Sequence, residues 1–357
     1  MGQSPGPDTF PVTSASAVVT TPYAPVVEEE LLFLPGGRTL AYMHSGPPDS
    51  NLIFFIWFHG LFSVGDASDP PPPIQKRGAH HIAPTLPGWG NTSPLAPGAS
   101  FASTVVEDTL ALLQHLRPLA RTTDRPAVPT PALRIYIAGG SFGTVPAQIV
   151  FGAPYAAFPY RRHIAGMLLM APFSPFREHT GYARGLEWRE WVSVGPLTRV
   201  VPGRGVERLM KLAIRGKVRD VARAEDFLRE EYFKGMNDEE RARYVAWRAR
   251  RGVEEGIFER RMAEGMVRSV SKSWEIAELD EEHARKPVVI AVGESDTSLV
   301  GLARYLGEQY KNVWMRKYEG WHLASAWSMD NLLEDMFAAG QSVGSTELSF
   351  ASESHRR

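Results

Sequence analysis

Unbroken runs of apolar residues mark the strands that we predict in this chain. Residues 52–58 are apolar at every position, and similar short runs recur further along the sequence. A strand that is covered on both faces has this pattern, as strands of a parallel sheet do. We predict strands at residues 52–58, 80–85, 134–138, 164–171, 287–292 and 313–318, preceded by a hairpin over 31–42 that turns at Pro-Gly-Gly.

Between these runs, apolar residues recur at helical spacing. The clearest case is residues 103–116, where the apolar positions are Val105, Val106, Leu110, Leu113 and Leu116. Similar patterns predict helices at 299–310 and 323–339, and another directly after Ser141. Strands that alternate with helices need right-handed crossovers, so we predict an α/β fold: a mostly parallel, eight-stranded sheet with helices on both faces. Such a sheet carries its active site at the carboxyl ends of the strands.

The composition changes between about residues 177 and 268. Arg and Glu alternate at i, i+3 and i+4 spacing there, and helical patterns over 206–214, 222–233 and 238–251 replace strands. We predict an inserted helical cap with a solvated outer face. The predicted organisation is a flexible arm (1–27), a core (28–175), the cap (176–272), the rest of the core (273–340) and a flexible tail (341–357). The four prolines at 70–73 predict a stiff surface loop, because proline does not fit a helix interior.

Composition also narrows the class of protein. The chain has 357 residues, of which 43% are hydrophobic and 22% charged, and a net charge of -1, so no nucleic-acid partner is expected. It has no cysteine, and the adjacent His80 and His81 point to opposite faces of a strand, so no metal site is expected. No run approaches the roughly 20 apolar residues that span a bilayer, and no signal peptide is recognisable. We expect a cytoplasmic protein that acts on a small molecule. Its oligomeric state stays open.

The sequence Gly-Gly-Ser-Phe-Gly at 139–143 is the stretch with the clearest chemistry. It joins a predicted strand to a predicted helix, which is the setting of a G-x-S-x-G nucleophile elbow. The chain must turn sharply there and present the Ser141 hydroxyl, so the neighbouring residues must be small. The N–H of Phe142, at the start of the helix, is a candidate oxyanion donor. A second candidate is the N–H of Leu61, which the His59-Gly60 turn presents after the neighbouring strand.

A serine hydroxyl is almost un-ionised at neutral pH, so it needs a base, and the base needs a carboxylate that fixes its tautomer. His322 is the candidate base, because it lies in a loop between a predicted strand and the last predicted helix. Asp296 is the candidate carboxylate, because it lies in the polar turn that follows the strand at 287–292. Glu294 and Glu178 are alternative carboxylates, since both also follow predicted strands.

Together these features resemble the capped α/β-hydrolases. The likeness covers about residues 28–340: the early hairpin, His-Gly after the third strand, Pro-Gly-Trp-Gly at 87–90, the elbow, the helical insertion, Gly-Glu-Ser-Asp at 293–296 and Gly-Trp-His at 320–322. The order serine, aspartate, histidine along the chain is also that of this family. The resemblance implies a cap that closes over Ser141 and shapes the substrate pocket, and a reaction without cofactor or metal. Thr85 stands where family members often have Asp, so a local structural bond is expected to differ.

The resemblance and the candidate site predict a serine hydrolase that cleaves a carboxylic ester, or a related acyl bond, through an acyl-enzyme. Epoxide hydrolases and haloalkane dehalogenases of this fold use aspartate as the nucleophile, so the serine argues against both. Two alternatives stay open. The elbow is similar to that of proline iminopeptidases, although residues 59–63 depart from their His-Gly-Gly-Pro-Gly segment, so an aminopeptidase is one. The other is a non-catalytic, ligand-sensing α/β-hydrolase.

Overall fold

An eight-stranded sheet in the order β1-β2-β4-β3-β5-β6-β7-β8 organises the molecule. The computed structural model describes residues 28–50, 54–61, 63–118, 133–184, 186, 212, 214–233, 239–254 and 280–340. The strands are β1 (Glu30–Phe33), β2 (Thr39–Ser45), β3 (Phe54–Phe58), β4 (His80–Pro84), β5 (Ile135–Gly140), β6 (Ile164–Met170), β7 (Val288–Gly293) and β8 (Val313–Tyr318). β2 pairs antiparallel with β1 and β4, and all other neighbours are parallel. The predicted mostly parallel α/β sheet is confirmed.

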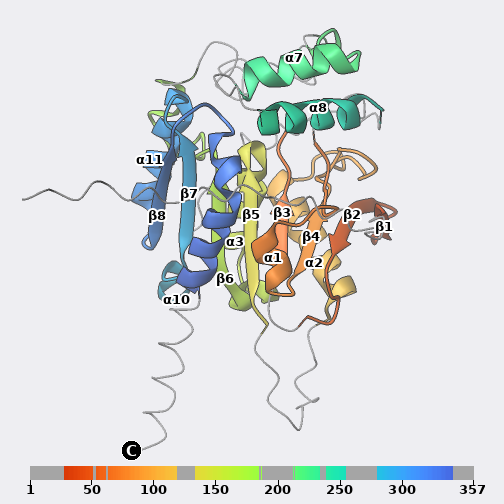
Figure 1. The fold of residues 1–357 in the computed structure, drawn as a ribbon. Coiled ribbons are helices and arrows are strands. Elements are labelled where there is room, and N and C mark those ends of the chain that lie inside the picture. The colour runs from red at the N-terminus through yellow and green to blue at the C-terminus, as the bar shows by residue number, and fades with distance from the viewer. Residues whose placement is uncertain are drawn as a thin grey trace, which may run out of the picture.

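Both faces of the central strands are buried, which explains the unbroken apolar runs. In β5, Ile135 and Ile137 join one core cluster, whereas Tyr136 and Ala138 join the cluster on the opposite face. The first face is covered by α2 (Phe101–Leu116), α3 (Thr144–Gly152) and α11 (Thr297–Gln309). The second is covered by α1 (Pro72–Lys76) and by the helical residues 329–340, which lie in front of the sheet (Figure 1).

The prediction of a loop throughout residues 70–73 is wrong in its second half. Pro72 and Pro73 form the first turn of α1. A proline fits there, because the first turn of a helix does not use its own N–H groups and the proline φ is already helical. Pro73 and the following Ile74 are buried, so α1 helps to cover the sheet rather than forming a surface loop.

The last helix begins later than the predicted residue 323. Ala324–Ser328 form the 3-10 helix η4, and the α-helix covers residues 329–340. The N–H of Ala324 donates to the Trp321 carbonyl at 2.9 Å, and that of Ala326 to the Leu323 carbonyl at 3.0 Å. These tighter bonds span three residues, so the α-helix cannot start until the chain has left the turn that contains His322.

Two helices, α7 (Val221–Glu231) and α8 (Glu239–Glu254), pack against each other above the carboxyl ends of the strands (Figure 1). They share a small apolar core that includes Phe227, Leu228 and Val245 and that also contacts η4 through Ala324. The described part of residues 176–254 contains no strand. The predicted boundaries of the cap at 176 and 272 stay a prediction, because much of this region lies outside the described residues, as do the predicted arm and tail.

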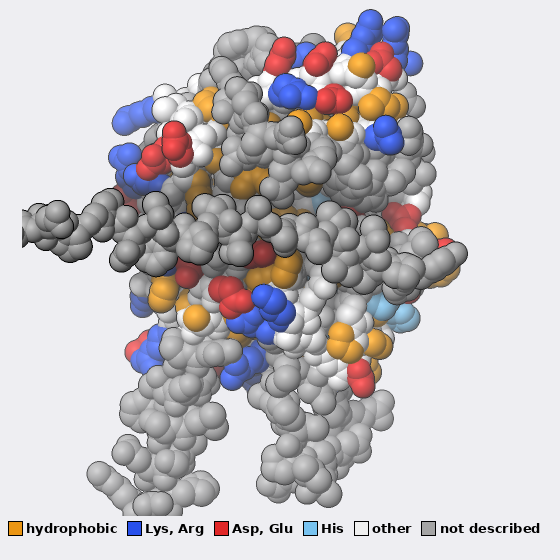
Figure 2. Space-filling model, in the orientation of Figure 1, with side chains coloured by type: hydrophobic (Ala, Val, Ile, Leu, Met, Phe, Trp, Pro, Cys, Tyr) orange, Lys and Arg blue, Asp and Glu red, His pale blue; other side chains and the backbone are white. Residues whose placement is uncertain are grey.

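The outer surface of these two helices carries basic and acidic side chains side by side (Figure 2). Arg229 and Glu225 form an i, i+4 ion pair on α7 at 2.6 Å. The charge of this region therefore lies partly on a solvated face, as its spacing predicts. Among the described residues, no helix has both the length and the apolar character needed to cross a bilayer.

Candidate active site

Ser141 lies where β5 turns into the 3-10 helix η1 (Ser141–Gly143) and then into α3. Its φ is 53°, a left-handed value that residues other than glycine seldom adopt. The flanking glycines allow this turn. A Cβ on Gly139 would lie 2.2 Å from the Gly143 carbonyl oxygen, and a Cβ on Gly143 would lie 2.1 Å from the Phe58 carbonyl oxygen. These neighbours are backbone atoms within the sheet and its turn, so they cannot give way, and the strained turn holds Ser141 at the carboxyl end of β5.

The imidazole of His322, in the loop after β8, joins this serine to a carboxylate. His322 Nε2 lies 2.9 Å from Ser141 Oγ, and His322 Nδ1 lies 3.0 Å from Asp296 Oδ2. An ionised carboxylate can only accept hydrogen bonds, so Nδ1 carries the proton and Nε2 offers its lone pair to the serine hydroxyl. Three residues from distant parts of the chain therefore form one continuous hydrogen-bonded chain.

Asp296 is held from two directions. It is only 2% exposed, and it is the N-cap of α11, where its Oδ1 accepts from the Leu299 N–H at 3.1 Å. Its other oxygen, Oδ2, faces His322. Because one oxygen is fixed by the helix start, the position of the second oxygen is fixed as well.

The loop that carries Asp296 and the loop that carries His322 are bonded to each other through the backbone. The N–H of Ser295 donates to the Gly320 carbonyl at 3.0 Å. A Cβ on Gly293, at the end of β7, would lie 2.2 Å from the Trp321 carbonyl oxygen, so the two loops are in close contact. The alternative carboxylates Glu294 and Glu178 are both exposed, and the carboxylate that hydrogen-bonds His322 is that of Asp296.

Comparison with known proteins identifies the family of the chain. The sequence model of the Alpha/beta hydrolase family matches residues 53–336, which include β3 to β8 and all three side chains of the hydrogen-bonded chain. The chain belongs to the alpha/beta hydrolase family. A search of curated protein sequences gives no significant match.

Solved structures of other alpha/beta hydrolases share the fold at low sequence identity. An esterase from Exiguobacterium antarcticum is 12% identical with a TM-score of 0.52, over 87% of this chain and 98% of that one. An esterase from Rhodococcus is 14% identical with a TM-score of 0.52, over 89% of this chain and 99% of that one. A bacterial membrane phospholipase A is 15% identical with a TM-score of 0.52, over 89% of this chain and 86% of that one. These similarities concern the fold.

In this alpha/beta hydrolase, the segment that contains Leu61 lies beside the elbow. β3 pairs with β5, with Phe58 opposite Gly139, so the two strands end together. A Cβ on Gly60 would lie 3.2 Å from the Gly140 carbonyl oxygen and 3.5 Å from Ser141 Cβ. Leu61 follows Gly60 in the sequence, and Phe142 follows Ser141. Among the described residues, no backbone hydrogen bond of a turn or loop uses the N–H of either residue.

His59 fixes the peptide that precedes Leu61. Its Nε2 accepts from the Leu86 N–H at 2.9 Å, so its Nδ1 carries the proton and donates to the Gly60 carbonyl at 2.8 Å. The carbonyl and the N–H of one peptide unit point in opposite directions, so this bond directs the Leu61 N–H away from His59. Burial lowers the pKa of His59 to about 4, which keeps the ring neutral and this bonding pattern intact near pH 7.

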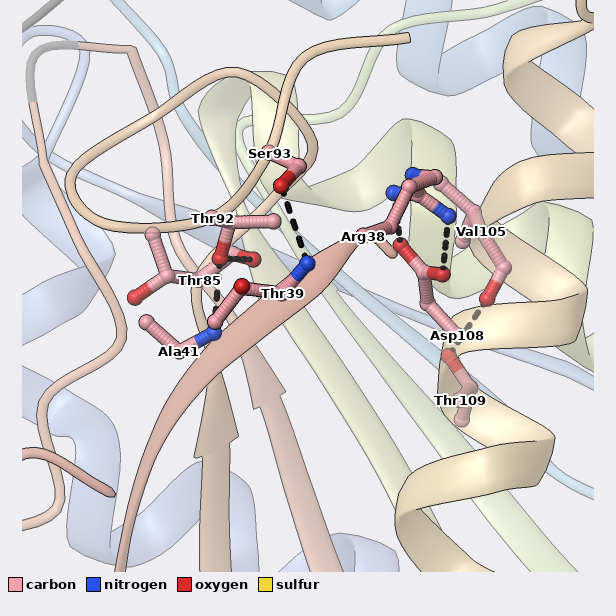
Figure 3. A network of polar contacts seen from close by, with 9 residues as sticks. All are labelled: Arg38, Thr39, Ala41, Thr85, Thr92, Ser93, Val105, Asp108 and Thr109. Atoms are coloured by element: carbon pink, nitrogen blue, oxygen red, sulfur yellow. Dashed lines mark hydrogen bonds and ion pairs between the residues drawn. The ribbon is translucent and has the colours of Figure 1, made fainter. Parts of the chain in front are cut away.

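The loop after β4 is bonded to β2, and Thr85 takes part in this network (Figure 3). Thr85 Oγ1 accepts from the Gly65 N–H at 3.0 Å, and its carbonyl accepts from Thr92 Oγ1 at 2.8 Å. Thr92 Oγ1 in turn accepts from the Ala41 N–H at 2.9 Å. A hydroxyl therefore serves as the acceptor at position 85, the position where the sequence departs from the family pattern.

Two contacts above the site were not predicted from the sequence. The ring of Tyr232, just after α7, packs edge-on against the His322 imidazole, with 5.5 Å between the ring centroids. The Arg248 guanidinium, on α8, donates through Nη2 to Ser63 Oγ in the loop after β3. Both residues lie in the region whose sequence indicates a solvated helical face, and no local motif distinguishes them from its other aromatic and basic residues.

Three other histidines have structural surroundings. Burial lowers the pKa of His81 to about 4, and His283 Nε2 lies 2.8 Å from the Phe151 carbonyl oxygen. His179 Nδ1 lies 2.8 Å from Ser174 Oγ. Within the described part of the chain, His, Asp and Glu side chains do not gather in groups of three or more that could hold a metal ion.

Proposed function

We propose that this alpha/beta hydrolase is a serine hydrolase that cleaves a carboxylic ester or a related acyl bond. The observation that carries the proposal is the chain of hydrogen bonds from Ser141 Oγ through His322 to Asp296, with both distances near 3 Å. It begins at a serine with φ of 53° at the end of a central strand. Such an arrangement turns a weak nucleophile into a strong one, because the base takes the proton as the oxygen attacks.

In the proposed reaction, Ser141 Oγ attacks the substrate carbonyl carbon while His322 Nε2 takes the hydroxyl proton. The negative charge that develops on the carbonyl oxygen is stabilised by the N–H groups of Leu61 and Phe142. His322 then gives its proton to the leaving oxygen, and the bond between that oxygen and the acyl carbon breaks. Water repeats the sequence on the acyl-enzyme, which releases the acid and restores the serine. Asp296 keeps the imidazole in the required tautomer throughout.

Labelling with a fluorophosphonate probe tests the activated serine. We expect the wild-type protein to be labelled and Ser141→Ala to stay unlabelled. Ser103→Ala is the matched control, since Ser103 is exposed on α2, and this variant should be labelled as the wild type is. Peptide mapping of the labelled protein should place the adduct on Ser141. A wild-type protein that resists the probe, while thermal unfolding shows it to be folded, contradicts the proposal.

Arg248 and the pattern of ester turnover separate the proposed hydrolase from an aminopeptidase and from a ligand sensor. An aminopeptidase needs a carboxylate that faces the ammonium group of its substrate. Among the described side chains of α8, the charged one that bonds the loop after β3 is Arg248. A cation in that place favours an ester substrate over a free amino terminus. A ligand sensor would react once with a p-nitrophenyl ester and then stop, whereas the proposed hydrolase should release p-nitrophenol in a steady state. Parallel assays with proline anilides complete the comparison.

A further inference from the structure

Arg248 occupies an unusual position for a charged side chain. It lies half-buried on α8, and its Nη2 donates to Ser63 Oγ, two residues after Leu61. α8 runs above the carboxyl ends of the strands (Figure 1). The guanidinium therefore faces the sheet, and it contacts the same loop that carries a candidate oxyanion donor.

The charge of Arg248 has no carboxylate partner among the described residues. A guanidinium offers five N–H donors, and the Ser63 hydroxyl accepts one hydrogen bond without supplying negative charge. Several other buried or half-buried arginines are paired with a carboxylate, among them Arg38 with Asp108 (Figure 3), Arg77 with Glu334, and Arg161 with Asp280. Withdrawing a positive charge from water without a counter-charge is unfavourable, so an anion in this place would be bound tightly.

The charge of Arg248 also acts on His59 and on Tyr232. Burial is the main reason that the pKa of His59 falls to about 4, and the charge of Arg248 lowers it further. Burial raises the pKa of Tyr232, and the charge of Arg248 opposes that rise. His59 holds the Leu61 peptide, and Tyr232 packs on His322. The guanidinium is thus within electrostatic reach of the oxyanion segment and of the residue that covers the base.

We infer that Arg248 binds an anionic oxygen group of the substrate, a carboxylate or a phosphate, at a position away from the bond that is hydrolysed. This inference rests on the proposed serine hydrolase function, and it narrows the substrate to an acyl compound that carries a free negative charge. Guanidinium groups bind carboxylates and phosphates through paired, charge-assisted hydrogen bonds. Among the described residues only Ser63 accepts a hydrogen bond from Arg248, which leaves four of the five N–H groups for such a pair. Ser63 then acts as a positioning residue that directs the guanidinium.

The experiment compares p-nitrophenyl esters whose acyl chains have the same length and end in a carboxylate, a phosphate or a neutral methyl ester. We expect the wild-type protein to prefer one of the charged esters, and Arg248→Met to lower the ratio of kcat/KM for that ester to kcat/KM for the neutral ester by about 10- to 100-fold. The preferred charged ester identifies the group that is bound. Arg248→Lys should retain part of the preference, because it keeps the charge but loses the planar fork.

Arg250→Met is the matched control, since Arg250 is exposed on the same helix, and it should keep the wild-type ratio. If Arg248 only attaches α8 to the loop, Arg248→Met and Ser63→Ala will lower the rates for charged and neutral esters equally, and the inference is wrong.

Should none of the esters turn over, protection of Ser141 from the fluorophosphonate by glutarate or by inorganic phosphate measures binding directly. Protection of the wild type but not of Arg248→Met supports the inference, and equal behaviour of the two contradicts it. Failure of labelling itself would contradict the proposed function instead.

Discussion

The carboxyl ends of the strands and the α7–α8 layer above them differ in how their polar groups are satisfied. At the strand ends each important group has a defined partner: Asp296 bonds both α11 and His322, and His59 bonds both Leu86 and Gly60. In the layer above, the described partner of Arg248 is a hydroxyl, and no described carboxylate pairs with it. The side chains of the lower region are therefore partnered without a ligand, whereas among the described residues the Arg248 guanidinium keeps N–H groups that have no acceptor. Under the proposed function, this contrast predicts that the strand ends perform the chemistry and that α8 selects the substrate.

The largest effect should come from the lower region, in Asp296→Asn. Asparagine caps a helix about as well as aspartate, so the start of α11 should be preserved. Its amide would donate to His322 Nδ1 and favour the wrong tautomer, and kcat for ester hydrolysis should fall by about 10⁴-fold with little change in Tm. Glu294→Gln, which removes an exposed carboxylate two residues earlier, should retain the wild-type rate. A rate for Asp296→Asn within tenfold of wild type would remove Asp296 from the mechanism.

The second-largest effect should be a loss of stability at low pH, caused by His81 in the sheet below the site. Burial lowers the pKa of His81 to about 4, and its ring nitrogens have no hydrogen-bond partner among the described residues. Below the ordinary histidine pKa near 6.5, the unfolded chain therefore binds a proton that the native state excludes, so stability falls as the pH decreases toward 4. The free energy of unfolding should drop by about 2 kcal/mol for this histidine between pH 7 and pH 5.

Urea unfolding of His81→Phe at the two pH values measures this contribution. Phenylalanine has a similar shape and would pack beside Phe55, whose ring centroid lies 5.4 Å from that of His81. The variant should lose less stability than the wild type on going from pH 7 to pH 5. An unchanged pH dependence would show that His81 does not contribute to it.

The smallest effect should arise where the two regions meet. Tyr232→Ala removes the ring that packs on His322, so the imidazole becomes freer to rotate, and kcat should fall by about tenfold. Tyr232→Phe keeps the ring and should retain most of the wild-type rate. If both variants lose the same activity, the phenol hydroxyl rather than the ring packing is what matters, and the upper region then contributes directly to the chemistry.

The fold and the positions of the candidate residues follow mainly from local sequence. The strand at 313–318 is observed with the predicted bounds, and the elbow lies between β5 and α3 as its glycines indicate. These features depend on neighbouring residues: apolar runs bury both faces of a strand, and glycines permit a turn that other residues cannot adopt. The loops that follow such strands meet at one end of the sheet, so Ser141, Asp296 and His322 could be chosen before their distances were known.

Other features were decided by tertiary structure. Pro72 and Pro73 start a helix because Ile74 finds a buried place beside the sheet, which the proline run does not reveal. The sequence of the α7–α8 region shows helical spacing and mixed charge, so it identifies the helices but not which arginine faces inward. That choice depends on how α8 lies across the sheet, because contacts between Arg248 and Ser63 join residues 185 positions apart. The sequence by itself indicated the candidate reacting groups, because they follow predicted strands. The packing of α8 over the sheet determined which arginine bonds the loop after β3, because that contact depends on tertiary structure.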